Sequence, residues 1–386
     1  MNEPCLGGRE NTICVLPWAH IACTIDGVWS RCCFDATNDY DTYYRQEDVP
    51  EFVLAPDALG CSPLSRYAKE NPDRVMGLKE AFNSEAMRRT RLQMIAGERP
   101  AACRSCFQQE DLGIESHRTA MNRILADEVG LADLIKATDS DGRLDRFPVH
   151  LDLRLGNTCN LGCIMCSFPV SSRLGAGRTP RWTAANIDPY KDDEQFWTTI
   201  REHAHEIRHL YLAGGEPFLQ PGHYRLLDLL IESGVARQIK IHYNSNLTVL
   251  PPGLWPRLKQ FKHVSIAASC DGVGEVFERI RAGGRWDVFV ANLRIARDHV
   301  EVWLDVTVQR DNIGDLTRLH SFARAEGVSM RAYNLLQYPE ELSVRSLSHE
   351  ERERHGEEVA RLMRICGRDE ADLVAELQRL HDYLLA

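Results

Sequence analysis

The sequence predicts an α/β fold built on a parallel sheet, with a cysteine-rich N-terminal domain and C-terminal helices. Beyond residue 148, strand-length apolar or alternating runs alternate with amphipathic helical segments. This alternation is typical of parallel strands joined by right-handed helical crossovers. The predicted strands are Val149–Leu155, His209–Ala213, Gln238–Asn244, His263–Ser269, Val302–Gln309 and Met330–Leu336, with helices at Tyr224–Glu232, Val288–His299 and Leu316–Glu326.

The length of 386 residues exceeds that of one ordinary domain. We expect a cysteine domain over residues 1–145, the α/β domain over 146–342 and helices over 343–386. In the last segment, Ser348-x-x-Glu351 is a capping box. Leucines at 373, 377, 380 and 384 then share one helical face, which indicates helices that cover the α/β domain or dock the N-terminal domain.

Composition limits the class of protein. Hydrophobic residues make up 44% and charged residues 26%, which is a globular composition. We see no signal peptide and no apolar run of membrane-spanning length, so we expect a cytoplasmic protein without a membrane partner. The net charge of -10 argues against nucleic acid and favours either a cationic substrate or an acidic surface that faces a basic redox partner. Without an export signal, the 13 cysteines indicate metal ligands rather than disulfides.

Three cysteines directly after the first predicted strand form a C-x3-C-x2-C motif. Cys159, Cys163 and Cys166 can give three thiolates to one 4Fe-4S cluster, and thiolate is the ligand that iron–sulfur clusters prefer. The fourth iron then has no protein ligand, which leaves a position for another molecule. The alternatives are a structural zinc site or a chance group of thiols.

At this motif the sequence resembles the radical S-adenosylmethionine (SAM) superfamily. The resemblance implies that SAM binds the open iron and that an electron from the cluster cleaves it to a 5'-deoxyadenosyl radical. It also implies a flavodoxin or ferredoxin as reductant. The six strand–helix units then resemble the partial (β/α)6 barrel of this family, in which the chemistry sits at the carboxyl ends of the strands.

Further motifs at the strand ends extend the resemblance. Gly214-Gly215-Glu216 follows the second strand, where the family's GGE motif holds the amino group of SAM. Alone, each of these strand ends is also consistent with an ordinary turn. The resemblance implies SAM contacts from Met165, Gly214, Gly215, Glu216, Ser245, Asn246 and Ser269.

The N-terminal cysteines form a second group. Asp26-Gly27, a dipeptide favoured in tight hairpin turns, joins predicted strands Ala19–Ile25 and Val28–Cys33. The hairpin brings Cys32 within reach of Cys14. A helix capped by Asn83 or Ser84 leads to a C-x2-C pair on a turn. The resulting four-thiolate set is Cys14, Cys32, Cys103 and Cys106.

This second set resembles the twitch domain, the shortened form of the SPASM domain, which holds an auxiliary 4Fe-4S cluster in a subset of radical SAM enzymes. The matching pattern is Cys14-x12-Gly27-x4-Cys32 followed by a distant C-x2-C. The best-known members carry this domain after the barrel, whereas here it comes first. Cys23 and Cys33 compete as ligands, and a zinc or rubredoxin-like site is the alternative.

The resemblance extends to aminocyclitol dehydrogenases of aminoglycoside antibiotic pathways. It implies an oxidoreductase that oxidises a hydroxyl-bearing carbon of a sugar or aminocyclitol to a ketone, with the auxiliary cluster as electron acceptor. Asp271 at a strand end is a candidate proton acceptor. One alternative is an epimerase in which Cys270 returns a hydrogen atom, although strand alternation turns this thiol away from the barrel interior. A peptide-modifying radical SAM enzyme is a further alternative.

Several polar residues alternate along the predicted strands and are expected to face the barrel interior. They can form buried salt bridges or contact a substrate, and the sequence leaves both readings open. These residues are Asp152, Arg154, Tyr243, Asp305, Thr307 and Gln309.

Overall fold

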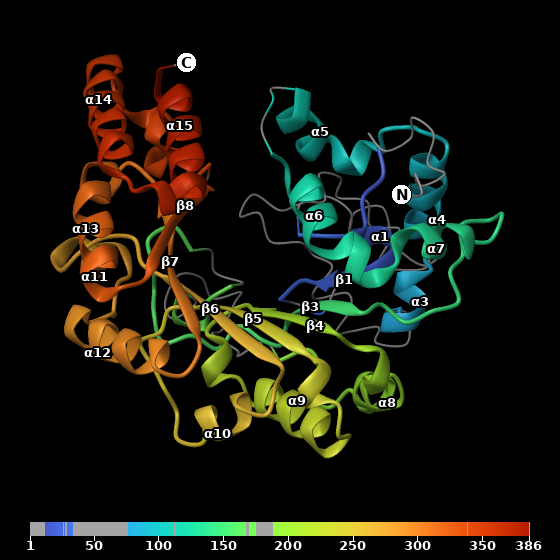
Figure 1. Cartoon of the computed structure of the whole chain (residues 1–386). Helices are drawn as coiled ribbons and strands as arrows, with labels where there is room; N and C mark the ends of the chain where they lie inside the picture. Colours follow the sequence, from blue (N-terminus) through green and yellow to red (C-terminus); the bar gives the residue numbers. More distant parts are fainter. Residues whose placement is uncertain are drawn as a thin grey trace, which may run out of the picture. The chain divides into compact units, whose positions relative to one another are not determined.

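The computed structural model describes residues 12–25, 27, 29–33, 76–111, 113, 115–166, 170–174, 188–337 and 339–385. The chain separates into two compact units, which we treat one at a time (Figure 1). The first unit comprises Met1–Leu155, Asp188–Tyr211 and Leu226–Ile239. The second comprises Gly156–Ile187, Leu212–Arg225 and Lys240–Ala386.

The first unit contains the predicted hairpin. Strands β1 (His20–Cys23) and β2 (Trp29–Ser30) pair antiparallel, and β1 also pairs in parallel with β3 (His150–Arg154). The turn residue Asp26 lies outside the described residues, whereas Gly27 has a φ of 85°, which only glycine adopts readily. The hairpin is therefore confirmed with shorter strands than expected, and it extends the sheet of the first predicted α/β strand.

Helices surround this hairpin. Arg91 of α4 is fully buried and donates hydrogen bonds to the carbonyl oxygens of Pro17, Phe82 and Gly142. One guanidinium thus ties three separate segments together. The helices of the unit are α1 (Leu16–Ala19), α3 (Leu78–Phe82), α4 (Glu85–Ile95), α5 (Arg104–Asp111), α6 (His117–Val129), α7 (Leu131–Lys136) and α8 (Glu194–Glu202), with 3-10 helices η5 (Ala101–Cys103), η7 (Ala204–Glu206) and η9 (Ala236–Gln238).

The second unit contains four parallel strands in the order β5-β6-β7-β8. They are β5 (Lys240–Ser245), β6 (His263–Ser269), β7 (Glu301–Val308) and β8 (Ser329–Leu335). Their helices are α10 (Leu254–Leu258), α11 (Glu275–Ile280), α12 (Trp286–Arg297), α13 (Leu316–Glu326), α14 (His349–Ile365) and α15 (Ala371–Leu385), with 3-10 helices η6 (Ser172–Leu174), η8 (Pro217–Leu219), η10 (Ile313–Asp315), η11 (Glu340–Leu342), η12 (Val344–Ser346) and η13 (Arg368–Glu370).

Strand β4 (His209–Ala213) and helix α9 (Pro221–Glu232) include residues of both units. With them, all six predicted strands are present, from β3 to β8, each within two residues of its expected bounds. Strands and helices alternate along the chain as predicted, and α12 and α13 pack on β7 and β8. The α/β class and the elements of a partial (β/α)6 barrel are therefore confirmed.

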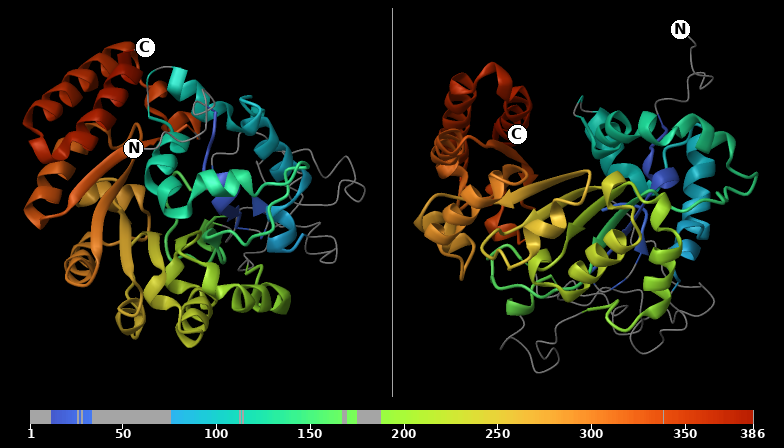
Figure 2. Two further views of the ribbon diagram at one scale, coloured as in Figure 1. Left: turned by 45° about the vertical axis from the view of Figure 1, so that its right-hand side comes forward. Right: turned by 60° about the horizontal axis from the view of Figure 1, so that its bottom comes forward.

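The C-terminal helices close the second unit. Ser348 and Glu351 form the predicted capping box of α14, and the four predicted leucines of α15 are buried. Helices α14 and α15 lie side by side (Figure 2). Glu376 of α15 accepts a hydrogen bond of 2.7 Å from the backbone N–H of Ala332 on β8, so α15 satisfies a donor at the edge of the sheet.

Within the described residues, no helix is both long and apolar enough to span a membrane.

Candidate functional site

The cysteine loop after β3 is held by backbone hydrogen bonds. Gly162 donates to Ala282, and Ile164 donates to Ile280, each at 2.9 Å. Ile280 ends α11, and a Gly283–Gly284 pair follows it closely in the chain. This segment, residues 280–284, therefore forms a backbone platform for the loop, and the sequence analysis did not identify it.

The sulfur atoms of the loop face nitrogen donors. The backbone N–H of Leu161 lies 3.5 Å from Cys159 Sγ, and the Asn246 amide lies 3.9 Å from the same atom. Arg281 Nη1 lies 3.9 Å from Cys163 Sγ. Burial raises the pKa of the Cys159 and Cys163 thiols, while the Leu161 N–H and the Arg281 cation act in the opposite direction, so these two sulfurs have groups beside them that stabilise thiolate ligands of a 4Fe-4S cluster.

Glu216 lies at the centre of the polar contacts. Its carboxylate is completely buried and accepts hydrogen bonds from Ser245 Oγ and Asn246 N, both at 2.8 Å, and from Phe218 N at 3.3 Å. Burial nevertheless raises the pKa of Glu216 to about 7. A carboxylate has about four acceptor sites, so one remains for a further donor. The site therefore favours a cation beside this group.

The two glycines before Glu216 have different roles. Gly214 has a φ of 90°, in the region that favours glycine. A Cβ at Gly215 would lie 2.4 Å from the carbonyl oxygen of Thr158, which directly precedes the first cluster cysteine. Glu216 N also donates to that Thr158 oxygen at 2.8 Å. Close packing of two backbones therefore joins the end of β4 to the cysteine loop.

Of the remaining predicted SAM contacts, Ser245 and Asn246 hydrogen-bond to Glu216. Ser245 and Asn246 are buried at the end of β5, and Leu247 after them is the one non-glycine residue with positive φ in the described part of the chain. Met165 and Ser269 are half-buried. The structure thus places Glu216, Ser245 and Asn246 in direct contact, while for Met165 and Ser269 it gives a position without a shared hydrogen bond.

Asp271, the predicted proton acceptor, forms a buried ion pair. Arg281 Nη2 lies 2.6 Å from its Oδ2, and Thr307 N donates to its Oδ1 at 2.8 Å. Arg281 thus connects Asp271 to Cys163. The sequence analysis did not identify Arg281. The available signal was its position, because it stands between an apolar helix end and a Gly–Gly pair, where an exposed charge is unusual. Cys270 beside Asp271 is completely buried and donates to Gly272 O.

Asp305 on β7 and Gln309, which directly follows β7, have side-chain atoms without a hydrogen-bond partner among the described residues. Asp305 is 5% exposed, and its Oδ1 has no hydrogen-bond partner; both amide atoms of the fully buried Gln309 also lack one. Burial and then the nearby Asp271 raise the pKa of Asp305 to about 7. Buried polar groups are rarely left unpaired, so these atoms indicate a place for a polar ligand.

The four predicted auxiliary cysteines come together within the first unit. Cys14, Cys32 and Cys103 line one pocket, with Arg31 and Thr90 among its other walls. Cys106 and Cys103 lie close enough to Cys14 to act on it electrostatically, and together with burial they raise the pKa of its thiol. The structure therefore gathers sulfur atoms from α5, η5, the hairpin and the segment before α1.

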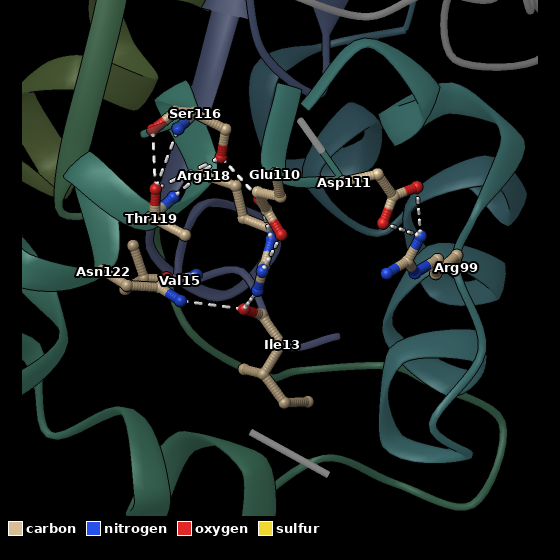
Figure 3. Close-up of polar contacts among 9 residues, drawn as sticks. All are labelled: Ile13, Val15, Arg99, Glu110, Asp111, Ser116, Arg118, Thr119 and Asn122. Carbon is tan, nitrogen blue, oxygen red and sulfur yellow. Dashed lines mark hydrogen bonds and ion pairs between the residues drawn. The ribbon is translucent and has the colours of Figure 1, made fainter. Parts of the chain in front are cut away.

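The backbone around Cys14 is fixed by α6 (Figure 3). Arg118 and Asn122 both donate to the carbonyl oxygen of Ile13, at 2.6 and 2.8 Å, and Val15 N donates to the Asn122 side chain at 2.7 Å. Arg118 also forms an ion pair with Glu110, one turn after Cys106 on α5. This network, absent from the sequence analysis, couples two of the cysteines through one buried arginine.

Of the competing cysteines, Cys33 lies close enough to Cys106 to interact with it electrostatically, whereas Cys23 contacts β3. Cys23 is buried on β1, and its sulfur accepts a hydrogen bond of 3.2 Å from Arg154 N on β3. Cys33 is exposed, and its sulfur lies 3.9 Å from His117 Nε2. Burial lowers the pKa of His117 to about 4, so this imidazole is neutral at pH 7. Neither cysteine lines the pocket that contains Cys14.

Comparison with known protein families gives a match over part of the chain. Residues 153–323 match the family model of the Radical SAM superfamily, and this range includes the three-cysteine loop and Glu216. The chain therefore contains a radical SAM domain, whose cofactors are a 4Fe-4S cluster and SAM. No curated protein matches the chain.

Solved structures with a similar arrangement include SuiB of Streptococcus suis. SuiB bound to precursor peptide SuiA has 14% identity and a TM-score of 0.41, with coverage of 72% of this chain and 62% of that one. SuiB bound to SAM has 16% identity and a TM-score of 0.40, with coverage of 74% and 64%. This chain thus spans less than two thirds of SuiB.

We expect Gly215→Ala to detach the cysteine loop from the end of β4, because the added Cβ meets backbone atoms that cannot turn away. Overpacking of this kind costs about 1–3 kcal/mol. Iron content after anaerobic reconstitution and 5'-deoxyadenosine formation should both fall. The control is Gly77→Ala, where a Cβ would meet only the end of the Gln195 side chain, at 3.5 Å. Equal iron and activity in both variants would contradict the role of this contact.

Proposed function

We propose that the protein is a two-cluster radical SAM oxidoreductase that oxidises an alcohol carbon of a small cationic sugar or aminocyclitol to a ketone. In this reaction, the radical supplied by bound SAM takes one hydrogen atom, a base takes one proton, and one electron passes to an acceptor. A flavodoxin or ferredoxin provides the reducing electron that cleaves SAM. The convergence of Cys14, Cys32, Cys103 and Cys106 carries this proposal, because a second cluster can accept the electron.

In the second unit, we assign Glu216 to the amino group of SAM. Its carboxylate has one acceptor site left after Ser245, Asn246 and Phe218, and burial raises its pKa to about 7, so a bound ammonium group would stabilise the ionised form. The serine and the asparagine hold the carboxylate in place. The ion pair of Arg281 and Asp271 sets the charge next to Cys163.

The proton acceptor is better assigned to Asp305 than to Asp271. Thr307 N donates to Oδ1 of Asp271 and Arg281 forms an ion pair with its Oδ2, whereas Oδ1 of Asp305 has neither a hydrogen bond nor an ion pair with any described residue. A base is most effective when its pKa is near the working pH, and the pKa of Asp305 is about 7. The unpaired amide of Gln309 can hydrogen-bond a substrate hydroxyl. The net charge of -10 suits a cationic substrate.

The burial of Cys270 supports oxidation over epimerisation. A hydrogen-atom donor must be free to reach the substrate radical, but the buried Cys270 thiol already donates to Gly272 O at 3.5 Å, whereas the equally buried amide atoms of Gln309 have no partner in the described part of the chain. Epimerisation and peptide modification are therefore outcomes that the following experiments separate.

The auxiliary set should bind its own cluster. After anaerobic reconstitution we expect about eight irons per chain, falling to about four in Cys103→Ala/Cys106→Ala with 5'-deoxyadenosine formation retained. The reciprocal control, Cys159→Ala/Cys163→Ala, should keep about four irons and lose SAM cleavage. Only about four irons in the wild type, or one zinc beside one cluster, would remove the auxiliary cluster and with it the electron acceptor.

The product should identify the reaction. We expect a panel of aminocyclitols and amino sugars, incubated in heavy water with SAM and dithionite, to give a product that is lighter by two hydrogens. N-acetylated analogues, which lack the cationic charge, should react poorly. Mass spectrometry distinguishes the alternatives: an epimer carries one solvent deuterium at otherwise unchanged mass, and no turnover of sugars together with turnover of a peptide would indicate a peptide-modifying enzyme.

Asp305→Asn should remove the proton acceptor. Because a base acts in its deprotonated form, wild-type ketone formation should rise with pH through about 7 and then level off. In the variant, this pH dependence should disappear and ketone formation should be about 10²–10⁴-fold slower, while 5'-deoxyadenosine still forms. Glu301→Gln, an equivalent change at an exposed position of the same strand, is the control. A pH step that survives in Asp305→Asn for ketone formation alone would assign the base elsewhere, whereas a step shared with 5'-deoxyadenosine formation would report Glu216, whose pKa is also about 7.

A further inference from the structure

Three side chains with metal-binding atoms converge far along the chain from both cysteine sets. They are His320 of α13, Cys366 at the end of α14 and Glu370 of η13, all in the second unit. Their ligand atoms all lie within 4.8 Å of one another, and no other His, Cys, Asp or Glu group in the described residues has this spacing. We call them the His–Cys–Glu group.

The distances within the group are close to those of a tetrahedral zinc site. His320 Nε2 lies 2.8 Å from Glu370 Oε1 and 4.0 Å from Cys366 Sγ. Usual zinc–ligand bond lengths place a nitrogen and an oxygen ligand about 3.4 Å apart, and a nitrogen and a sulfur ligand about 3.6 Å apart. A bound zinc ion would therefore move His320 Nε2 and Glu370 Oε1 apart, and bring His320 Nε2 and Cys366 Sγ closer together, in each case by only about half an ångström.

The chemistry of the three groups also agrees. Imidazole nitrogen, thiolate sulfur and carboxylate oxygen are the three ligand types that proteins use for zinc. A thiolate, a carboxylate and a neutral imidazole carry two negative charges, which one divalent cation neutralises.

We propose that His320, Cys366 and Glu370 bind one zinc ion, with water as the fourth ligand, and that this ion fastens the C-terminal helices to the α/β part of the second unit. The ion would connect α13, which packs on β8, to the junction between α14 and α15. Cys366 and Glu370 are only half-buried, so the ion can enter from solvent. This site needs no radical chemistry and stands independently of the proposed function.

The test uses the cluster-loaded protein and zinc chloride as the probe. Alkylation of Cys366 by iodoacetamide, followed by mass spectrometry of its peptide, reports this site even if zinc also occupies incomplete cluster sites. We expect zinc to slow alkylation at least about tenfold, and a chelator to restore it. Metal analysis should find about one zinc more in the wild type than in Cys366→Ala at equal iron content.

Two variants separate a metal site from a simple hydrogen-bonded pair. His320→Ala should abolish the protection of Cys366 by zinc. His355→Ala should not, because His355 and Glu358 form a similar pair at 2.8 Å but belong to no such three-residue group among the described residues. If zinc leaves alkylation of Cys366 unchanged in the wild type, or protects it equally in His320→Ala, the group is only an ion pair beside a thiol.

Discussion

The buried carboxylate of Glu216 is the constraint on which the site depends. Removing a carboxylate from water costs several kcal/mol unless donors surround it, and hydrogen bonds to a charged group return about 1.5–3 kcal/mol each. Ser245 and Asn246 supply two of these donors from the end of β5. The Asn246 amide also lies 3.9 Å from Cys159 Sγ. The hydrogen bonds to Glu216 therefore hold the carboxyl ends of β4 and β5 next to the cysteine loop.

Much of this arrangement follows from local sequence pattern. The six strands and the end-of-strand motifs were predictable because parallel strands show as apolar runs and their carboxyl ends share one edge. Arg281 and Arg118 were not, because a buried arginine is recognised by partners that are distant in sequence: Asp271 and Cys163 for one, Glu110 and Ile13 for the other. The pairing of β1 with β3 was also hidden, since periodicity does not specify strand neighbours.

The two cysteine sets are built on different physical principles. The loop after β3 has its sulfurs near backbone and amide donors and is held against residues 280–284 by backbone bonds. The N-terminal set collects cysteines from four short elements, and Arg118 links two of these elements by its ion pair with Glu110 on the helix of Cys106 and its hydrogen bond to Ile13 O beside Cys14. The first set offers three thiols and the second four, so under the proposed function only the second could enclose a cluster with protein ligands alone.

Glu376 has a consequence for how the sheet ends. A partial barrel leaves an outer strand whose backbone donors can pair with any passing extended chain, which is the usual route to edge-to-edge aggregation. Here the carboxylate of Glu376 on α15 accepts a hydrogen bond from the N–H of Ala332, and Arg331 forms an ion pair with the same carboxylate at 3.2 Å. Helix α15 thus pairs a backbone donor of β8, and a shortened chain without α15 would leave this donor free to pair with a strand of another molecule.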